Sequence, residues 1–534
     1  MFKIHETWKK ARCSTLTLHH GPCRTPMFMP VGTQGAMKGI TTSQMLELDV
    51  DLMLSNTYWM SLRPGPEEVA TFGGLHGLMS WPRNILTDSG GFQMVSLIDL
   101  STVTEEGVTF TSPLDGKEMM LRPEDSIHNQ NELGADIIMA LDDVVPSVMT
   151  GPRVKEAMQR TIRWLDRCIA AHKRPNDQCL FAIVQGSLDV ELRKDCVNEF
   201  LKRDASIPGY AIGGLSGGEE KDTFIAVVDA VCSLLPPQKP RYVMGVGYPV
   251  DIVCCVCVGA DMFDCVYPCR TARFGTALAD VPGGVVSLRS EKFTNDATPM
   301  DKSCNCYVCR GGISRARLHQ MLKGEKEGGV ELISYHNIAY MMNLMSRLRQ
   351  SIRDNTLPAF AKYYMRTLFP RRIDLPSFVN IAFRLADIDE DFASNGYPAD
   401  EELIVDDSVF LSILQTDCKD IPIRCPYHVE ERNIHGVSRI KKGEVEDDSS
   451  PSSKQIKQIE KKAKSSQKDK NIREGWAKKE LIKQQMREQK EKKKQQRADA
   501  PVIQMGTSFA RLVDFNPETG DSQKRQCLDS EGNK

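Results

Sequence analysis

A short cysteine cluster near residue 305 has the spacing of metal ligands. Cys304, Cys306 and Cys309 lie close together, and His336 follows about one structural unit later. Three thiols and one imidazole are a set that binds zinc in tetrahedral geometry. Four protein ligands leave no coordination position for water or substrate, so the cluster predicts one structural Zn²⁺ per chain. The reactive groups are therefore expected elsewhere.

A second group of residues follows the ends of apolar segments that have the composition of strands. They are carboxylates, an amide and exposed backbone: Asp88, the pair Asp142–Asp143, Gln185, Gly213–Gly214 and Asp264. Asp143 is expected only to cap the following helix. Asp264 lies within an apolar strand, where an uncompensated carboxylate is costly. Because the carboxyl ends of parallel strands meet at one face of a barrel, we predict that these residues form one site.

The chemistry that suits this group is substitution at a sugar carbon. One carboxylate can attack an anomeric carbon and hold it as an ester, while a second moves protons on the leaving and entering bases. A third carboxylate, the amide and a backbone N–H can read the Watson–Crick edge of a purine. Phe92 and Met244 can sandwich that base by stacking. The reaction requires neither a metal nor a nucleoside triphosphate.

The segments that position these residues alternate between apolar strands and amphipathic helices from residue 50 to 270. The predicted strands are Asp51–Ser55, Ile85–Asp88, Asp136–Leu141, Phe181–Gln185, Tyr210–Gly214, Tyr242–Gly245 and Met262–Val266. Buried strands separated by helices indicate a parallel sheet, and seven or eight such units fit a (β/α)8 TIM-like barrel. A doubly wound sheet is the alternative, but no G-x-G-x-x-G or P-loop motif follows an early strand.

Composition divides the chain into three regions. Residues 1–385 form the predicted barrel domain, including a zinc subdomain at about 290–340 that leads into an amphipathic helix over His336–Arg353. Residues 386–435 form an acidic extension whose structure the sequence does not predict. Residues 436–534 are rich in Lys and Gln with few aromatic side chains, which predicts a disordered, basic C-terminal tail.

Charge and cysteine content indicate the compartment and one class of partner. The apolar runs are too short to span a bilayer, and the N-terminus has no apolar signal region. A chain with 17 cysteines and no such signal is expected in a reducing compartment, the cytoplasm. The net charge is −2, yet residues 451–500 hold 17 Lys and Arg against 7 Asp and Glu. Such a run is typical of an arm that binds nucleic acid, and a solvated segment with no specific role is the alternative. Five further cysteines are expected to be buried and unpaired: Cys254, Cys255, Cys257, Cys265 and Cys269.

Long motifs connect residues 10–385 to a known family. They are Met-Pro-Val-Gly-Thr-Gln near residue 32, Leu-Thr-Asp-Ser-Gly-Gly-Phe-Gln-Met-Val-Ser-Leu at 86–97, Ala-Ile-Gly-Gly-Leu-Ser-Gly-Gly-Glu at 211–219, Phe-Asp-Cys-Val-Tyr-Pro-Cys-Arg-Thr-Ala-Arg at 263–273 and Ser-Tyr-His-Asn at 334–337. With these motifs and the zinc ligands, the chain resembles the tRNA-guanine transglycosylases, and among them the catalytic subunits of the eukaryotic queuine enzymes.

The resemblance implies a modified barrel with a zinc subdomain that exchanges a guanine in tRNA for a deazapurine. Asp264 matches the family's covalent nucleophile, and Asp88 matches its general acid and base. Arg270 and Arg273 match the arginines that hold the nucleotides beside the exchanged guanine. The residues that match the base pocket are Asp142, Gln185, Gly214, Ser89 and Leu215, with Phe92 and Met244 as the stacking pair.

Two positions bear on which base enters. Val144 and Gly217 stand where bacterial members carry Cys and Val, and they agree with the eukaryotic members. A glycine removes a side chain beside the base, which fits queuine, whose cyclopentenediol is larger than the aminomethyl group of the bacterial substrate. Cys269 departs from the family's usual Thr before the first arginine, which affects the expected contacts to tRNA but not the role of Asp264.

The full expectation is an enzyme of queuosine modification. The resemblance implies exchange of the wobble guanine of GUN-anticodon tRNAs (Asp, Asn, His, Tyr) for queuine, in a heterodimer with a non-catalytic paralogous subunit. Homodimers remain open, and so does association with the mitochondrial outer surface. The alternatives are the accessory subunit itself, which would lack part of the acid set, an archaeosine-type transglycosylase with a C-terminal RNA-binding domain, and a zinc-dependent RNA-binding module without catalysis.

Overall fold

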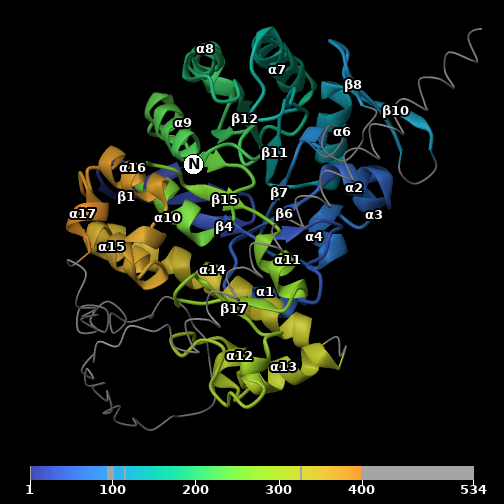
Figure 1. The fold of residues 1–534 in the computed structure, drawn as a ribbon. Helices are drawn as coiled ribbons and strands as arrows, with labels where there is room; N and C mark the ends of the chain where they lie inside the picture. Colours follow the sequence, from blue (N-terminus) through green and yellow to red (C-terminus); the bar gives the residue numbers. More distant parts are fainter. Residues whose placement is uncertain (1, 93–100, 113–115, 325–327, 398–534) are drawn as a thin grey trace, which may run out of the picture. The chain divides into compact units, whose positions relative to one another are not determined.

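A computed structural model of the chain describes residues 2–92, 101–112, 116–324 and 328–397 (Figure 1). All of them belong to one structural unit, Met1–Pro426. The predicted tail at 436–534 and most of the acidic extension at 386–435 lie outside the described residues.

A parallel sheet closes into a barrel at the centre of this unit. Its strand order is β4-β15-β14-β13-β12-β11-β7-β6-β5. The bounds are β4 Met27–Met29, β5 Val31–Gly32, β6 Leu52–Ser55, β7 Asn84–Thr87, β11 Ile137–Met139, β12 Cys179–Val184, β13 Gly209–Ile212, β14 Arg241–Val243 and β15 Met262–Asp264. The predicted strands from residue 50 to 270 are confirmed, each within a few residues of its expected ends.

One bent strand closes the barrel. Only Pro30 separates β4 from β5; β4 pairs with β15, and β5 pairs with β6. Proline has no N–H to donate, so the ladder changes partner there, while the Pro30 carbonyl still accepts from Leu54 N at 2.9 Å. The two short segments therefore act as one strand, which makes eight in all. The predicted (β/α)8 class is confirmed, and the doubly wound alternative is wrong.

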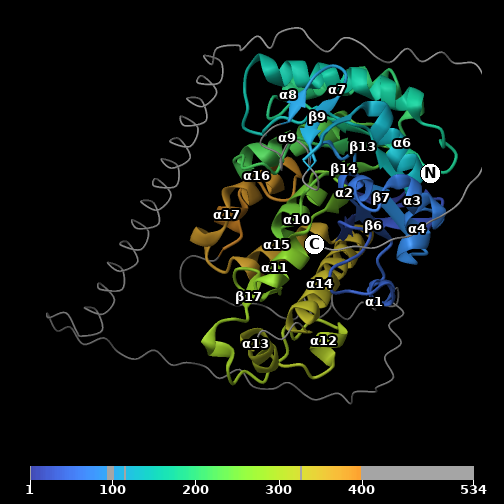
Figure 2. The same cartoon turned by 90° about the vertical axis from the view of Figure 1, so that its right-hand side faces the viewer.

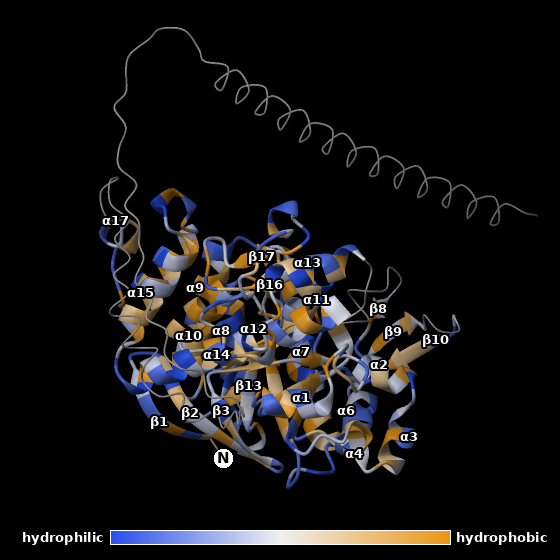
Figure 3. Ribbon diagram, turned by 90° about the horizontal axis from the view of Figure 1, so that it is seen from below, coloured by the Kyte–Doolittle hydropathy of each residue, from blue (hydrophilic) through white to orange (hydrophobic). Residues whose placement is uncertain are grey.

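Helices surround the barrel and connect its strands. They are α1 Thr42–Glu47, α2 Thr57–Leu62, α3 Pro66–Thr71, α4 Gly74–Met79, α6 Pro123–Leu133, α7 Pro152–Ala171, α8 Val190–Leu201, α9 Lys221–Leu234, α10 Pro249–Cys257 and α11 Tyr267–Arg273. Every residue of α10 except the half-buried Val250 is buried, whereas β1 (Phe2–Trp8), which lies at the edge of a separate sheet, is mostly exposed. Figure 3 shows this contrast as a largely hydrophobic α10 and a largely hydrophilic β1.

Two three-stranded antiparallel sheets beside the barrel were not predicted. The first contains β1, β2 (Ala11–Leu18) and β3 (Gly21–Thr25), and its residues Leu16, Leu18 and Cys23 pack in one cluster with the inward-facing residues of the barrel. This sheet therefore covers the amino end of the barrel. The second, β8 Thr102–Val103, β9 Val108–Thr111 and β10 Glu118–Leu121, is inserted between β7 and α6.

The zinc-motif segment follows the barrel and packs on a long helix (Figure 2). Its elements are β16 Thr276–Leu278, β17 Val285–Ser287, α12 Tyr307–Arg310, α13 Arg315–Lys323 and α14 Gly328–Arg353. The helix predicted to begin at His336 in fact begins at Gly328, so His336 lies inside it. Ile338, Met341, Met345 and Leu348 are buried on its inner face and Met342 is half-buried, so the apolar side of the predicted amphipathic helix packs in the core.

The described chain continues beyond the barrel in four elements. They are α15 Leu357–Leu368, the 3-10 turn Arg372–Asp374, α16 Ser377–Leu385 and α17 Phe392–Asn395. Phe392 is fully buried, with its ring centroid 5.0 Å from that of Phe383, and Tyr397 donates to the Phe369 carbonyl at 2.8 Å. The chain thus stays packed past residue 385.

Two expectations from composition can be compared with this fold. Within the described ranges, no helix is long and apolar enough to cross a membrane. Cys254, Cys255 and Cys257 are buried free thiols as predicted, whereas Cys265 and Cys269 are only partly buried.

Candidate active site and metal centre

The candidate catalytic residues gather at the carboxyl end of the barrel because they directly follow, or end, parallel neighbouring strands. Asp88 follows β7, Asp142 lies beyond β11, Gln185 follows β12, Gly213 and Gly214 follow β13, Met244 follows β14, and Asp264 ends β15. These six strands are consecutive neighbours in the sheet. The sequence prediction that they share one face of a barrel is consistent with this order.

Asp264 is held by two neutral donors on one of its oxygens. Oδ1 accepts from the Tyr242 hydroxyl at 2.5 Å and from Gly245 N at 2.7 Å. Among the described residues, no hydrogen bond is made to Oδ2. Burial raises the pKa of Asp264, and the hydrogen bonds from Tyr242 and Gly245 partly offset that rise. The carboxylate is thus fixed in position while one oxygen stays available to react.

Asp88 is positioned by the start of helix α2. Its side chain accepts from Asn56 Nδ2 at 2.5 Å and from Thr57 N at 3.0 Å. Asp88 lies close enough to Tyr242 that burial, Asp264 and Asp88 all raise the pKa of the Tyr242 phenol well above its ordinary value. Tyr242 therefore lies near both candidate catalytic carboxylates and keeps its proton.

Asp142 and Gln185 form a buried pair in the same site. Asp142 Oδ2 accepts from Gln185 Nε2 at 2.6 Å, and Oδ1 accepts from Ser89 Oγ at 3.4 Å. Burial raises the pKa of Asp142 to about 6. Gly214 lies against the amide, since a Cβ at this position would stand 2.3 Å from Gln185 Oε1. A carboxylate, an amide and a glycine backbone thus lie together, and they can bind the polar edge of a flat ring.

Asp143 has a different role from the predicted helix cap. Helix α7 begins after Gly151, so Asp143 does not cap it. Its two oxygens instead accept from Arg153 at 2.6 Å and from Arg160 at 2.5 Å, and its backbone N–H donates to Thr161 Oγ1 at 3.0 Å. A buried carboxylate needs such partners. The ion pairs anchor the loop that carries Asp142.

The residues predicted to stack on the base and to contact RNA are at least partly exposed to solvent. Phe92 is 57% exposed, while Met244 and Leu215 are half-buried. Arg270 and Arg273 both lie on α11, directly after Asp264, and are exposed. Side chains that bind a substrate from outside must be accessible, and these are.

The surroundings of Gly217 refine the prediction that its missing side chain opens space. A Cβ at Gly217 would stand 2.8 Å from Ser147 Oγ, so Ser147 occupies that direction. The carboxylate of Glu219 accepts from Ser216 N at 2.6 Å and Gly217 N at 2.8 Å and holds the turn. Val144, two residues after Asp142, is half-buried. The glycine thus accommodates Ser147 rather than leaving empty space at its Cα.

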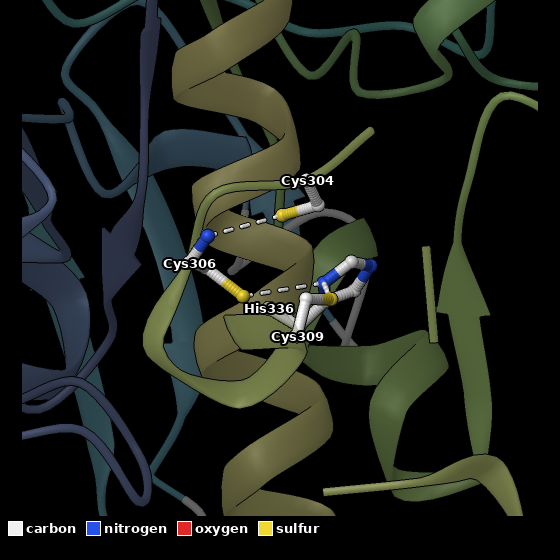
Figure 4. Close-up of side chains that lie close together, drawn as sticks. All are labelled: Cys304, Cys306, Cys309 and His336. Atoms are coloured by element: carbon white, nitrogen blue, oxygen red, sulfur yellow. Dashed lines mark hydrogen bonds between the residues drawn. The ribbon is translucent and has the colours of Figure 1, made fainter. Parts of the chain in front are cut away.

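The metal-ligand cluster is brought together by α12 and α14. Figure 4 shows the three thiols and the imidazole turned toward one another, and their ligand atoms all lie within 4.8 Å. Nδ1 of His336 lies 3.5 Å from Cys306 Sγ and 3.3 Å from Cys309 Sγ, while its Nε2 contacts the Leu278 carbonyl at 2.7 Å. The carbonyl fixes Nε2 as the donor, which leaves Nδ1 free to bind a metal. The set could hold a metal ion, and its thiolate and imidazole donors are compatible with zinc.

A second group with metal-ligand atoms lies at the amino end of the barrel and was not predicted. It comprises His20, His76 and the buried Asp136. Asp136 accepts from His20 Nδ1 at 2.7 Å and His76 Nε2 at 3.0 Å. The two imidazoles are stacked with centroids 3.7 Å apart and planes at 16°. Lone pairs of parallel stacked rings do not converge on one point, so this group is better described as a hydrogen-bonded clamp.

Three residues of the site were not predicted from the sequence: Tyr242, Asn56 and Thr57. Each binds a candidate catalytic carboxylate from another strand or loop. The only available signal was a tyrosine within the apolar segment around residue 242, and buried tyrosines usually need a partner for their hydroxyl. Asn56 and Thr57 resemble an ordinary helix start, since Asn56 also caps α2.

Comparison with known proteins adds independent evidence. Residues 7–370 match the family model described as queuine tRNA-ribosyltransferase. The chain is 49% identical over 387 residues to the queuine tRNA-ribosyltransferase catalytic subunit of Schizosaccharomyces pombe, covering 71% of this chain and 95% of that protein. It is 54% identical to the catalytic subunit of Caenorhabditis elegans, covering 66% and 87%. It is 44% identical to the queuine tRNA-ribosyltransferase of Thermus thermophilus, covering 70% and 95%.

Proposed function

The chain belongs to the queuine tRNA-ribosyltransferase family, and from this premise we propose that it exchanges the wobble guanine of GUN-anticodon tRNAs for queuine. These tRNAs carry Asp, Asn, His and Tyr. The observation that carries the proposal is the geometry of Asp264. One of its oxygens is fixed by Tyr242 and Gly245, and the other is free of hydrogen bonds from the described residues.

In the first step, Asp264 Oδ2 attacks C1′ of the guanosine while the C1′–N9 bond breaks. The bonding electrons leave with guanine, and the ribose is held as an ester of Asp264. Tyr242 remains protonated because burial and the nearby carboxylates raise its pKa, so it donates a hydrogen bond without competing as a base. That hydrogen bond keeps Asp264 aligned with the sugar carbon.

Asp88 is proposed as the general acid and base. It gives a proton to the departing guanine and takes one from the entering queuine, whose ring nitrogen then attacks C1′ and releases Asp264. Hydrogen bonds from Asn56 and Thr57 support this role, since they hold the carboxylate at the end of β7. Proton number and charge balance over the full exchange.

The base is proposed to lie between Phe92 and Met244, with its polar edge toward Asp142 and Gln185. The ionised carboxylate would accept from purine N–H groups, and Ser89, Leu215 and the Gly214 backbone would line the same edge. Val144 and Gly217 are proposed to shape the side that receives the cyclopentenediol of queuine. Ser147, whose Oγ lies where a side chain at Gly217 would begin, is part of the same side.

The tRNA is proposed to bind across Arg270 and Arg273. Both are exposed on the helix after Asp264, where they can neutralise phosphates flanking the exchanged nucleotide. We further propose a heterodimer with a non-catalytic paralogous subunit that helps to position the tRNA, in the cytoplasm or at the mitochondrial outer surface. The names of the two eukaryotic relatives, which are catalytic subunits, favour this chain as the catalytic member of the pair.

Cys304, Cys306, Cys309 and His336 are proposed to hold one structural Zn²⁺. When bound, the ion would supply four bonds that tie α12 to α14, with no open position for chemistry. Metal analysis of the purified protein is expected to give about one zinc per chain, and Cys309→Ser should lose it and unfold at lower temperature. A variant that keeps wild-type metal content and melting temperature would contradict this assignment.

Trapping of the covalent intermediate tests the reaction. The full chain and its proposed paralogue are incubated with a GUN-anticodon tRNA and a slowly released purine analogue, then run on a denaturing gel. Wild type is expected to give a shifted protein–tRNA band, Asp264→Asn none, and Asp264→Glu a weak one. Exchange of labelled guanine without any band would instead indicate direct displacement. A folded, zinc-bound protein with neither band nor exchange would favour the accessory-subunit alternative.

A further inference from the structure

A buried arginine beneath the candidate base pocket has no place in the mechanism above. Arg193 lies on the inner face of α8, is fully buried, and points its guanidinium at the carboxyl ends of β12 and β13. We infer that Arg193 is a positioning residue for base binding, which fixes the backbone that carries Gln185 and Gly214. This inference rests on the proposed function of that site.

Three backbone carbonyls accept from the guanidinium. Nε donates to Ser187 O at 2.7 Å, Nη1 to Val184 O at 3.0 Å, and Nη2 to Gly213 O at 2.8 Å. Val184 is the last residue of β12, and Gly213 directly follows β13. The regular ladder between these strands ends there, with Val184 opposite Ile212 and a final bond from Gly213 N to Val184 O at 3.2 Å. Arg193 therefore binds the last carbonyl that strand pairing holds, at Val184, and the first that lies beyond it, at Gly213.

Two of the three carbonyls, those of Val184 and Gly213, are adjacent to a residue of the base pocket. Val184 precedes Gln185, and Gly213 precedes Gly214, whose Cα lies against the Gln185 amide. A shift of either carbonyl would move the amide, or the glycine backbone, relative to Asp142. The planar guanidinium has several donors in a fixed fork, so it can hold three carbonyls in one arrangement, whereas a lysine ammonium cannot reproduce that geometry.

The charge on Arg193 makes this arrangement costly. In the described part of the chain, no carboxylate contacts its guanidinium, and burial lowers the pKa of Arg193 to about 10. Charged donors make stronger hydrogen bonds to carbonyls than neutral ones, which offsets part of the desolvation cost. Such costly features are expected where function requires a defined geometry.

The loop after β13 is held from both sides. Arg193 binds its first carbonyl, at Gly213, and the Glu219 carboxylate binds the N–H groups of Ser216 and Gly217 at its far end. Leu215 lies between the two anchors. The segment that should cover the base is thus fixed at both ends by buried charges, which is a means of preorganising a binding site.

The barrel offers a matched control in Arg241. This arginine is also buried and also binds backbone carbonyls, Gly259 O at 3.2 Å and Leu235 O at 3.1 Å. It belongs to the amino end of β14, away from the base-binding residues at the carboxyl ends. A general role of buried arginines in stability would make substitutions at the two positions equivalent.

The test compares Arg193→Lys and Arg193→Gln with Arg241→Lys in the full chain with its proposed paralogue. Exchange of labelled guanine is measured with guanine and tRNA varied separately, and queuine is assayed as competitor. Both Arg193 variants are expected to raise the KM for guanine and queuine at least about tenfold, with the KM for tRNA changed less than about twofold. Arg241→Lys should lower the melting temperature while leaving the KM for guanine unchanged.

Several results would overturn the inference. One is a set of Arg193 variants with lower melting temperature but unchanged KM for guanine. Another is an equal rise in the KM for guanine and the KM for tRNA. Failure of both Arg193 variants to fold would also overturn it, since Arg193 would then be a stability residue like Arg241. Absence of exchange in the wild-type protein would instead count against the proposed function itself.

Discussion

Strand β15 is short, yet it has a carboxylate at each end, and the two are held in opposite ways. Asp261, before its first residue, is fully buried and paired with Arg12, whose Nε donates at 3.1 Å. Asp264, its last residue, is bound by a phenol and a backbone N–H, and no described cation pairs with it. The first carboxylate is neutralised and buried from solvent, whereas the second keeps an available oxygen.

The same contrast holds between the two ends of the barrel. At the amino end, Asp49 and Asp51 pair with Arg24, and Asp136 is clamped by two histidines. At the carboxyl end, Asp142 accepts only from neutral donors among the described residues, an amide and a hydroxyl. Charge pairing at the amino end stabilises the fold. At the carboxyl end Asp143 is also paired with arginines, but no described cation pairs with Asp142 or Asp264, which leaves these two carboxylates able to react or to bind a ligand.

The largest expected difference between the two ends of β15 is in catalysis. Asp264→Asn should lower the rate of guanine exchange about 10⁴-fold or more, because the amide cannot form the ester. The melting temperature should stay close to that of wild type, since no ion pair is lost. Steady-state exchange and thermal unfolding measure both quantities, and exchange within tenfold of wild type would contradict the assigned role.

Asp261→Asn should have the complementary effect. It leaves Arg12 buried without its carboxylate and is expected to lower the free energy of unfolding by about 3 to 5 kcal/mol. Urea unfolding measures this loss. The KM for guanine of the remaining folded protein should match that of wild type. A changed KM for guanine with unchanged stability would contradict the assignment of Asp261 to stability and of Asp264 to catalysis.

Ionisation of Asp142, at the carboxyl end of the barrel, should make the stability of the protein depend on pH. Its pKa of about 6 in the folded protein exceeds the ordinary value of an unfolded Asp, about 3.9, so the folded state binds more protons between these values. This residue therefore lowers stability by roughly 2 to 3 kcal/mol as pH rises through that window, and Asp142→Asn should remove that slope.

The same ionisation should govern base binding. Below about pH 6 the protonated acid accepts poorly from purine N–H groups. The KM for guanine should therefore rise about tenfold for each further unit by which the pH falls. Exchange measured from pH 5 to 8 tests this expectation. A flat profile of KM would indicate that Asp142 does not bind the base as a carboxylate.

His76→Ala should give the smallest effect, at the amino end. Hydrogen bonds from His76 and His20 outweigh burial and lower the pKa of Asp136, so the stability that they contribute is present above the pKa of an unfolded Asp and is lost as pH falls through the folded value. The variant should be about 1 kcal/mol less stable at pH 7, with the difference shrinking toward pH 3. Guanine exchange and zinc content should not change; a loss of metal would revive this cluster as a metal site.

Much of the architecture could be predicted because its signals are local. The strands of residues 50–270 were recognisable as short apolar runs, and parallel topology then brought Asp88, Asp142 and Asp264 to one end of the barrel. The strand around Pro30 and the sheet over the amino end were missed, since β4 and β5 are very short and β1 has only weak alternation. Short or edge strands are defined by their partners more than by their own sequence.

The sequence alone determined the chemical identity of the acids, the spacing of the metal ligands and the order of strands, because each depends on residues near one another in the chain. Only the tertiary structure decided which groups hold those acids. Asp264 is held by Tyr242, 22 positions away, and Asp261 by Arg12, 249 positions away. Arg193, the residue inferred to fix the proposed base pocket, binds Gly213 across 20 positions. Hydrogen bonds between separate strands leave no local pattern, since their geometry exists only after the barrel has closed.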